Sequence, residues 1–453
     1  MTLGEILRKS IHITAGALAL LLPFLTRWQA LVICLLAAAS NGLFLPRLTR
    51  HALERDEDRR RGFAAGIIYY PLSIGALLIF FGGRMEVVAA AWGILAFGDG
   101  FATLAGRRIG GPTLAWNAGK TWSGLAAFAV AGATGAMLLM TWFFRHAPDA
   151  AAPPGLAIIA WSCGAAALVA AFIESYPSGM NDNITVPLSA GCLLFGLSFV
   201  DASLLADRAG GLARDAAIAV SVNLIVAATA RAAGTVSNSG AIAGVVVGTS
   251  IWTFGGFGAW GVLIAFFVLA SGATKFGYAG KAQRRLAQEA GGRRGARHAI
   301  ANGGVAVVLS FLAAATGIGD AMRLALVAAL ATAAFDTLSS ELGQVWGRRA
   351  FLITTLRRVP PGTEGAVSVE GTLAGATGAT LLALLAWSAG LAGIPGAAII
   401  VLAATVGATF ESFLGAIGRG SPPGEGFDNE AMNFINTLVG AATALALSLL
   451  TGL

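Results

Sequence analysis

The chain of 453 residues is 56% hydrophobic and only 12% charged, with a mean hydropathy of +0.76. Soluble domains carry roughly twice that share of charged residues, so the composition excludes an ordinary water-soluble protein. The net charge of +7 does not predict binding of nucleic acid, because the basic residues occur in short loops between apolar runs, where they orient membrane spans.

Apolar runs long enough to cross a hydrocarbon core of roughly 30 Å recur along the whole chain. They predict an all-α fold, a polytopic transmembrane helical bundle with about fifteen spans. The predicted spans cover residues 11–26, 28–46, 63–81, 86–104, 124–144, 155–173, 184–200, 215–233, 239–254, 258–273, 299–317, 321–341, 367–389, 395–412 and 431–451.

The basic residues orient these spans. With the N-terminus inside, the predicted outside loops hold only six of the 30 Lys and Arg residues. The same topology places four motif-bearing loops inside, at residues 99–124, 174–183, 341–370 and 411–429. We therefore predict a protein of the cytoplasmic membrane whose active sites face the cytoplasm.

A set of motifs occurs twice in the same order. GDGFATLAGRRIGG, KTWSG, FIES and NDNITVPL follow one another in the first half, and FDTLSSELGQVWG, SVEGT, FESF and FDNEAMNFINTLVG in the second. Asp99 and Asp336 are eight predicted spans apart, an even number, so both copies have the same orientation. The pattern predicts two parallel tandem repeats, with domains at residues 1–232 and 233–453.

In the first half, Asp99 ends an apolar run and is followed by Gly100, Gly106 and, further on, Lys120. A carboxylate at the membrane boundary can bind Mg²⁺ or act in catalysis, glycines let phosphates approach the backbone, and a lysine neutralises them. The alternative is an aspartate that ends a helix before a turn glycine.

Lysine usage supports a functional role for Lys120. Only four of the 30 basic residues are lysines, namely Lys9, Lys120, Lys275 and Lys281. Three of the four fall in motif-like loops, which indicates roles that a guanidinium fills poorly. Chance placement of so few residues is the alternative.

Glu174 and Asp182 bracket a Pro/Gly turn, and Asn183 follows directly. Oxygen ligands of this kind suit Mg²⁺ bound through nucleotide phosphates, so we predict both carboxylates as metal ligands, Asp182 also as a catalytic group and Asn183 as a nucleotide contact. A polar loop that merely needs solvation is the alternative, although a related pattern recurs at residues 411–430.

In the second half, Asp336 and Glu341 lie near the end of a predicted span, with Ser339 and Ser340 between them. Such a polar cluster is costly in lipid unless it faces a cavity or a partner. We predict both carboxylates as catalytic groups and metal ligands. The further predicted metal ligands of this half are Glu370, Glu411 and Asn429.

Arg357 and Arg358 precede a loop that carries Glu364, Glu370 and Gly371. Arginines, glycines and carboxylates in tandem predict a cradle for phosphate and metal, in which the two arginines and Gly371 contact the nucleotide. A role of the arginines in membrane orientation alone is the alternative.

Three other sequence features predict a functional role less directly. His12 lies in the first turn of the first span, where it can contact phosphate, transfer a proton or simply lie at the interface. The basic loop 275–297 is predicted to lie in solvent near anionic lipid headgroups, with attraction of nucleotide as a second possibility. Cys34, Cys163 and Cys192 lie in apolar runs without the spacing of a zinc site or a disulfide framework.

The motifs also resemble known families. RKSIH, GDGFATLAGRRIGG, KTWSG and NDNITVPL, over roughly residues 1–230, resemble the phytol kinase and dolichol kinase family of CTP-dependent membrane lipid kinases. SGAIAGVVVGT, ANGGVA, FDTLSSELG, TLRRVPPGTEGAVSVEGT and FESFLGA, from about residue 235 onward, look like the family that includes the plant phytyl-phosphate kinase.

This resemblance implies a fusion of two successive activities. The first half is expected to phosphorylate an isoprenoid alcohol of the phytol or geranylgeraniol class, and the second to phosphorylate the monophosphate to the diphosphate. The nucleoside triphosphate CTP is the implied donor of both reactions, with Mg²⁺ as cofactor. The positions that match the motifs are Asp99, Lys120, Glu174 and Asp182 in the first half and Asp336, Glu341, Glu370, Glu411 and Asn429 in the second.

One position departs from the pattern, since Ser123 of TWSG stands opposite Glu370 of SVEG. Ser123 and Glu370 therefore need not do the same job in the two halves. Two other functions remain open at this stage. A CTP-dependent cytidylyltransferase would use the same nucleotide and lipid phosphate but release pyrophosphate, and a secondary transporter would also show internally repeated helices.

Overall fold

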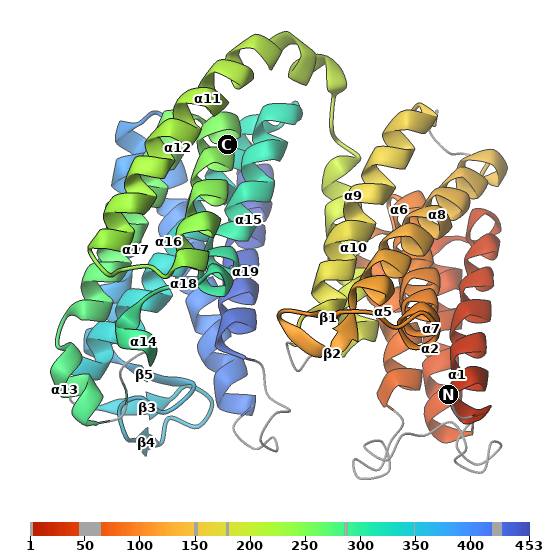
Figure 1. Ribbon diagram of the computed structural model, residues 1–453, viewed down its shortest axis with the longest axis horizontal. Coiled ribbons are helices and arrows are strands. Elements are labelled where there is room, and N and C mark those ends of the chain that lie inside the picture. The colour runs from red at the N-terminus through yellow and green to blue at the C-terminus, as the bar shows by residue number, and fades with distance from the viewer. Residues whose placement is uncertain are drawn as a thin grey trace. The chain divides into compact units, whose positions relative to one another are not determined.

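The computed structural model describes residues 3–44, 65–148, 153–177, 181–284, 286, 289–347, 349–418 and 428–453. The chain divides into two compact units, Met1–Ser198 and Phe199–Leu453 (Figure 1). Each unit is a helical bundle with a few short strands at one end, so the described chain is largely, but not wholly, α-helical.

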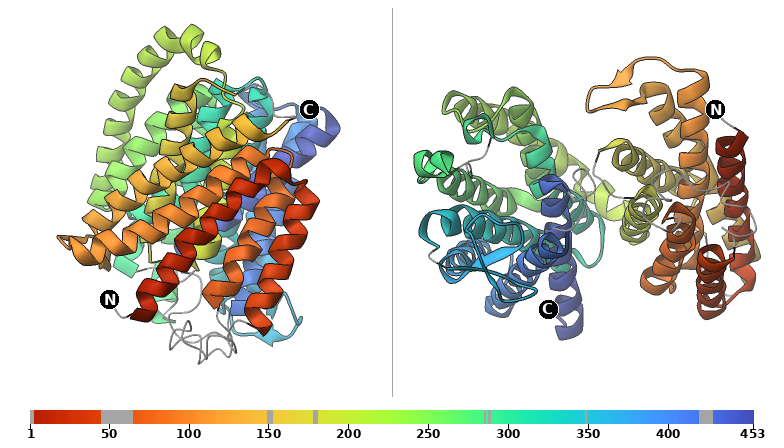
Figure 2. Two further views of the ribbon diagram at one scale, coloured as in Figure 1. Left: turned by 90° about the vertical axis from the view of Figure 1, so that its right-hand side faces the viewer. Right: turned by 90° about the horizontal axis from the view of Figure 1, so that it is seen from below.

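The first unit is built around one long buried helix. Its elements are α1 (Leu3–Ala15), η1 (Gly16–Phe24), α2 (Arg27–Leu43), α5 (Ala65–Phe81), α6 (Met85–Gly93), η2 (Ile94–Asp99), α7 (Gly100–Arg108), β1 (Thr113–Leu114), β2 (Asn117–Thr121), α8 (Trp122–His146), α9 (Leu156–Ser175) and α10 (Asp182–Leu197). The elements α6, η2 and α7 form the continuous helix Met85–Arg108, which packs against α1, α8 and α10. The strands β1 and β2 pair antiparallel and lead directly into α8 (Figure 2).

The second unit has a similar plan. Its elements are α11 (Ala202–Ala232), α12 (Asn238–Lys275), α13 (Tyr278–Gln283), α14 (Glu289–Gly292), α15 (Ala296–Ala315), α16 (Gly319–Trp346), β3 (Ala350–Leu352), β4 (Arg358–Val359), β5 (Ala366–Ser368), α17 (Val369–Ser388), α18 (Ile394–Gly418) and α19 (Asn429–Thr451). The central helix is α16, which packs against α12, α15, α17, α18 and α19. Its many alanines allow this crowding, because small side chains let helix backbones approach closely.

Helix α12 consists of two arms that fold back on each other. Gly256 has a φ of 87°, which breaks the helix and which a residue with a side chain rarely adopts. At the turn, the rings of Trp252 and Trp260 lie 4.8 Å apart between centroids. At the far end, Lys275 Nζ donates to the carbonyl oxygen of Ala233 at 2.9 Å, so the second arm ends beside the start of the first.

The observed helices can be compared with the predicted membrane spans. Ten helices among the described residues are long and apolar enough to cross a membrane, and Lys9–Phe24, Gly66–Phe81 and Asp182–Leu197 are shorter apolar helices. Every predicted span overlaps a helix, and spans 239–254 and 258–273 correspond to the two arms of α12. Residues 45–46 and 63–64 of the predicted spans lie outside the described residues. The total of about fifteen spans stays a prediction.

Two expectations need correction. The structure divides the chain between Ser198 and Phe199, whereas the sequence predicts a boundary after residue 232, because α11 packs against α12 and α15 and so belongs to the second unit. The prediction of an all-α fold misses two small antiparallel sheets, β1–β2 and β4–β3–β5. Apart from the end of β5, these strands form in the polar loops outside the predicted spans, where apolar periodicity carries no information.

Candidate active site

Asp99 lies on the buried central helix of the first unit, at the end of a π-helical turn. Such turns are rare and often occur at functional sites. Lys9 Nζ donates to both carboxylate oxygens of Asp99 at 2.8 Å, and His12 Nε2 lies 3.4 Å from Oδ2. Because a buried carboxylate without a partner is strongly destabilising, α1 supplies the charge that allows Asp99 to lie in an apolar helix.

His12 is held in place beside this ion pair. Its Nε2 donates to the carbonyl oxygen of Leu95 at 3.2 Å, and its ring packs edge-on against Tyr70, with 4.7 Å between centroids. Tyr70 in turn accepts a hydrogen bond from Trp92 Nε1 at 2.9 Å. The imidazole is therefore oriented toward Asp99 by groups from three other positions of the bundle.

The β1–β2 hairpin brings Lys120 to the end of α9. Asn117 Nδ2 donates to the carbonyl oxygen of Ser175 at 2.9 Å, and Trp116 Nε1 donates to Ser175 Oγ at 3.1 Å. Lys120 Nζ then forms an ion pair with Glu174, whose side chain is buried. The hairpin thus places an ammonium group against the carboxylate at the C-terminal end of α9.

Lys120 interacts electrostatically with all three predicted carboxylates of the first half. Burial opposes its charge, but neighbouring carboxylates outweigh that effect, so the pKa of Lys120 is raised. Glu174 contributes most to the rise, followed by Asp182 and Asp99. Asp182 and Asn183 form the first turn of α10. The structure therefore brings Lys120 and the three predicted carboxylates into one cluster, and we call these four residues the first cluster.

The predicted phosphate-binding glycines of this half serve helix packing. A Cβ atom at Gly100 would lie 2.4 Å from Ile13 Cγ1, and one at Gly106 would lie 3.1 Å from Thr121 Oγ1. Open backbone occurs instead at residues 110–111, which have φ values of 65° and 110° and no atom within 4 Å of an added Cβ.

In the second unit, Asp336 lies on the central helix α16 and is buried. Its carboxyl group lies near that of Glu411 on α18 and near Ser340. Glu364 lies close enough to add negative charge around Glu411. Two buried carboxylates close together repel each other, so Asp336 and Glu411 form an acidic pair that a proton or another cation would stabilise.

Glu341, one turn further along α16, is neutralised by a lysine. Lys281 Nζ donates to Glu341 Oε2 at 2.5 Å and to the carbonyl oxygens of Ala273 and Thr274 at 3.2 and 2.9 Å. The Lys281 side chain is 0% exposed and the Glu341 side chain 6%. All three N–H groups of the ammonium are therefore satisfied, as a fully buried charge requires.

The other predicted residues of the second half lie at more open positions. Arg357 and Arg358 are exposed around β4, Asn429 is exposed at the first position of α19, and Glu370 is half-buried in the first turn of α17. Gly371 is a packing glycine, since an added Cβ would lie 2.6 Å from a backbone oxygen of α16. Roles of these residues in binding nucleotide or metal stay predictions.

The two aspartate-bearing helices pack in the same way against the helix that follows them. In each unit, the glycine seven residues after the aspartate packs on the glycine three residues after the N-cap of the next helix. A Cβ on the first glycine would lie 3.7 Å from the second glycine's Cα in the first unit and 3.4 Å in the second. These pairs are Gly106 with Gly124 and Gly343 with Gly371. The two units share this helix contact, while the tandem repeat and the parallel orientation of its copies stay predictions.

The donor sets differ in how well they fit Mg²⁺. No group of three or more His, Cys, Asp or Glu side chains in the described part of the chain converges on one metal position. Asp99 and Glu174 are already neutralised by lysines. The Asp336–Glu411 pair fits better, because Mg²⁺ is commonly held by one or two carboxylates and completes its shell with water and substrate phosphates.

Sequence reasoning did not nominate Lys9 or Lys281 as site residues, although the scarcity of lysine pointed to them. Three of the four lysines neutralise a predicted carboxylate, through the pairs Lys9–Asp99, Lys120–Glu174 and Lys281–Glu341. A compact ammonium fits such buried positions better than a planar guanidinium.

Known proteins that resemble this chain are membrane proteins. Residues 221–441 match the family described as Integral membrane protein DUF92. An uncharacterized membrane protein of Synechocystis is 37% identical over 207 residues, which are 45% of this chain and 78% of the relative. The chloroplast protein VTE6 of Arabidopsis thaliana is 34% identical over 213 residues, or 46% of this chain and 64% of that protein.

A second group of relatives carries kinase names. The chloroplast farnesol kinase of Arabidopsis thaliana is 28% identical over 214 residues, which are 42% of this chain and 66% of that enzyme. No solved structure matches the chain. On the family match and the Synechocystis relative, the chain belongs to the integral membrane protein family DUF92.

Proposed function

We propose that this protein is a membrane-bound isoprenoid lipid kinase with two successive activities. The first unit transfers a phosphoryl group from a nucleoside triphosphate, CTP, to a prenyl alcohol, and the second unit transfers another to the prenyl monophosphate. Both sites face the cytoplasm in this proposal, which rests on the excess of Lys and Arg in the predicted inside loops.

One observation supports this proposal above the others. Each unit carries an aspartate on its most buried long helix, near the end where short strands lie, with further carboxylates and a lysine beside it. Phosphoryl transfer needs chiefly the alignment of donor and acceptor and the neutralisation of charge, and such a set of groups provides both. The kinase names among the relatives point to the same class of reaction.

In the first unit, the hydroxyl oxygen of the prenol attacks the γ-phosphorus of CTP. The bond between that phosphorus and the β,γ-bridging oxygen breaks, CDP leaves, and the hydroxyl proton passes to a carboxylate. Asp182 is the candidate base, because Asp99 and Glu174 already form ion pairs with Lys9 and Lys120. Lys120 is placed to neutralise the phosphates that approach this cluster.

In the second unit, the nucleophile is a phosphate oxygen of the prenyl monophosphate, which is already an anion. No base is required, but two phosphorylated substrates bring much more negative charge. Asp336 and Glu411 would bind Mg²⁺, which supplies charge neutralisation between the phosphates. Glu341 lies on the same helix, and its partner Lys281 of α13 also holds the end of α12 next to this position.

Product analysis tests the proposal. The full-length protein in lipid nanodiscs is incubated with geranylgeraniol, Mg²⁺ and CTP carrying the label at either the α- or the γ-phosphate, and lipids are identified by mass. The γ-label in a monophosphate and then a diphosphate is expected, with CDP as co-product. Label from the α-phosphate in a lipid would show cytidylyl transfer instead, and no labelled lipid with any of several prenols and nucleotides would overturn the kinase assignment.

A further inference from the structure

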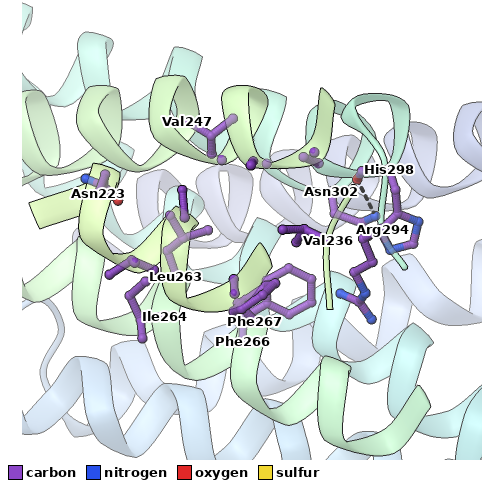
Figure 3. A pocket seen from close by; sticks show the side chains of 18 of the residues that line it. Asn223, Val236, Val247, Leu263, Ile264, Phe266, Phe267, Arg294, His298 and Asn302 are labelled. Carbon is purple, nitrogen blue, oxygen red and sulfur yellow. Dashed lines mark hydrogen bonds between the residues drawn. The ribbon is translucent and has the colours of Figure 1, made fainter. Parts of the chain in front are cut away.

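The second unit contains an elongated pocket between α11, both arms of α12 and α15. It encloses about 750 Å³ of empty space, part of which is open to the surroundings. Most of its wall is apolar, with Val247, Leu263, Ile264 and Phe266 among its lining residues (Figure 3). A pocket of this kind fits an apolar chain.

One end of the pocket is polar, and several of its polar atoms lack hydrogen-bond partners. Arg294, His298 and Asn302 lie together there (Figure 3). Arg294 Nε, His298 Nε2 and Asn302 Oδ1 are buried and have no hydrogen-bond partner among the described residues. Buried polar atoms are nearly always paired in native proteins, so three orphaned atoms around one cavity indicate that a ligand completes them.

At the opposite end of the pocket, the polar side chain of Asn223 already has hydrogen-bond partners within the protein. Asn223 Nδ2 donates to the carbonyl oxygen of Ala219 at 2.8 Å, and Asn223 Oδ1 accepts from Trp260 Nε1 at 3.1 Å. A ligand therefore has polar partners to gain at the Arg294 end only. This asymmetry fits an amphiphile with a single polar head and one apolar tail.

The backbone fixes Arg294 at this end. Its N–H donates to the carbonyl oxygen of Thr235 at 3.0 Å, and its own carbonyl oxygen accepts from Ser237 at 3.0 Å. Gly240 allows this close approach, because an added Cβ would lie 2.1 Å from the Arg294 carbonyl oxygen. Burial lowers the pKa of Arg294 to about 10, although Glu341 opposes the shift, so a bound anion would relieve the cost of the buried charge.

The polar end also adjoins the candidate active site of the second unit. Arg294 Nη2 lies 3.4 Å from Thr274 Oγ1, and the carbonyl oxygen of Thr274 accepts a hydrogen bond from Lys281. Lys281 forms the buried pair with Glu341 on α16. A head group at Arg294 would thus lie one layer of side chains from Glu341 of α16.

We propose that this pocket binds the prenyl monophosphate, with its isoprenoid chain between α11 and α12 and its phosphate on Arg294, His298 and Asn302. The identification of the ligand as a reaction substrate rests on the proposed function. Arg294 donates to the phosphate, and Asn302 Oδ1 accepts from its remaining P–OH group. Arginine is suited to this role, because its guanidinium binds phosphate through several donors at once.

Photolabelling tests the site without relying on activity. The full-length protein in phosphatidylcholine nanodiscs is exposed to geranylgeranyl monophosphate with a diazirine at the tail end, and labelled peptides are mapped by mass spectrometry. Label is expected in α11 and α12. Arg294→Gln should reduce it at least about tenfold through loss of the charged contact to phosphate, and the exposed neighbour Arg293→Gln should not.

A second variant tests the apolar part of the pocket. At Gly244, which lines the pocket, an added Cβ meets no atom within 4 Å, so Gly244→Phe should fill the space and block labelling. Gly261→Phe, on the other arm of α12, is the matched control because its Cβ is equally unhindered and it does not line the pocket. Size-exclusion profiles establish that each variant is folded.

Competition separates the sources of the phosphate group. Unlabelled geranylgeranyl monophosphate should displace the probe, whereas inorganic phosphate or dioleoyl phosphatidic acid at equal concentration should not. Equal displacement by phosphatidic acid, label outside α11 and α12, or equal loss in both members of a variant pair would overturn the proposal. Specific labelling without kinase activity would leave the site standing and refute the proposed function, while kinase activity with label elsewhere would do the reverse.

Discussion

The two units place an aspartate on a buried helix in the same way but balance its charge differently. In the first unit, Asp99 is paired with Lys9 and Glu174 with Lys120. In the second, Asp336 and Glu411 lie near each other as an acidic pair. The first cluster therefore carries its own cations, whereas the acidic pair of the second unit requires a proton or a bound cation.

This difference matches the two proposed reactions. An alcohol is neutral and must lose a proton, so a site that uses protein amines and a free carboxylate suits it. A monophosphate is already charged and must meet a second polyphosphate, so a site that binds Mg²⁺ and an arginine suits it better. The following predictions test whether substitutions in the two units have different effects, as this contrast requires.

The largest effect is expected from Glu411→Gln. Loss of one carboxylate of the acidic pair should lower formation of the diphosphate by about 10³-fold and raise the Mg²⁺ concentration needed for half-maximal rate, because the cation loses a ligand. The measurement is the rate of each product against Mg²⁺ concentration. Phosphorylation of the alcohol should be unchanged, and an equal loss of both products would contradict the separation of the sites.

A large loss of stability is expected from Lys281→Met. It leaves Glu341 buried without its partner, which costs about 3–5 kcal/mol of unfolding free energy for a buried pair. Thermal unfolding in detergent measures this. Lys120→Met should cost clearly less, since the Lys120 side chain is 37% exposed. The double variant Lys281→Met/Glu341→Gln should recover part of the loss, and no recovery would mean that the pair itself is not responsible.

A smaller loss of stability is expected from substitutions of the packing glycines. These substitutions test the same helix contact in both units. Gly371→Ala places a Cβ 2.6 Å from a backbone oxygen, which is expected to cost about 1–3 kcal/mol through displacement of α17 from α16. Gly124→Ala places it 3.2 Å from the corresponding backbone atom and should cost less. Unfolding midpoints of the two variants provide the test. The opposite order would show that the two crossings are not packed as described.

The smallest effect is expected from Arg297→Ala. Arg297 pairs with Asp428 at 2.6 Å, but its side chain is 50% exposed. Exposed pairs contribute less than about 1 kcal/mol, so the unfolding temperature should barely move and should move even less at high salt. A loss as large as that of Lys281→Met would mean that exposure does not separate structural from incidental ion pairs here.

The sequence predicts the helices and the aspartates of this protein well, because both leave local signals. A run of apolar residues has the length of a membrane crossing, and Asp99 or Asp336 interrupts such a run at its end. The break between spans 239–254 and 258–273 is equally local, since it depends on the conformation of Gly256.

The partners of the carboxylates could not be predicted, because they lie far away along the chain. Lys9 and Asp99 are 90 residues apart, and Lys281 and Glu341 are 60 apart. The same limit explains the domain boundary, since the composition of α11 shows that it is apolar but not which unit it packs against. The pocket at Arg294 combines both problems, as its lining comes from three helices and two loops.

The central claim, two sites with separate reactions, is tested most directly by crossing two variants with two substrates. Asp99→Asn and Asp336→Asn are each assayed with geranylgeraniol and with geranylgeranyl monophosphate in the presence of CTP and Mg²⁺. Asp99→Asn should fail to use the alcohol but still convert added monophosphate, and Asp336→Asn should convert the alcohol and accumulate monophosphate. If both variants keep both activities, or if each loses both, the assignment of one reaction to each unit is wrong.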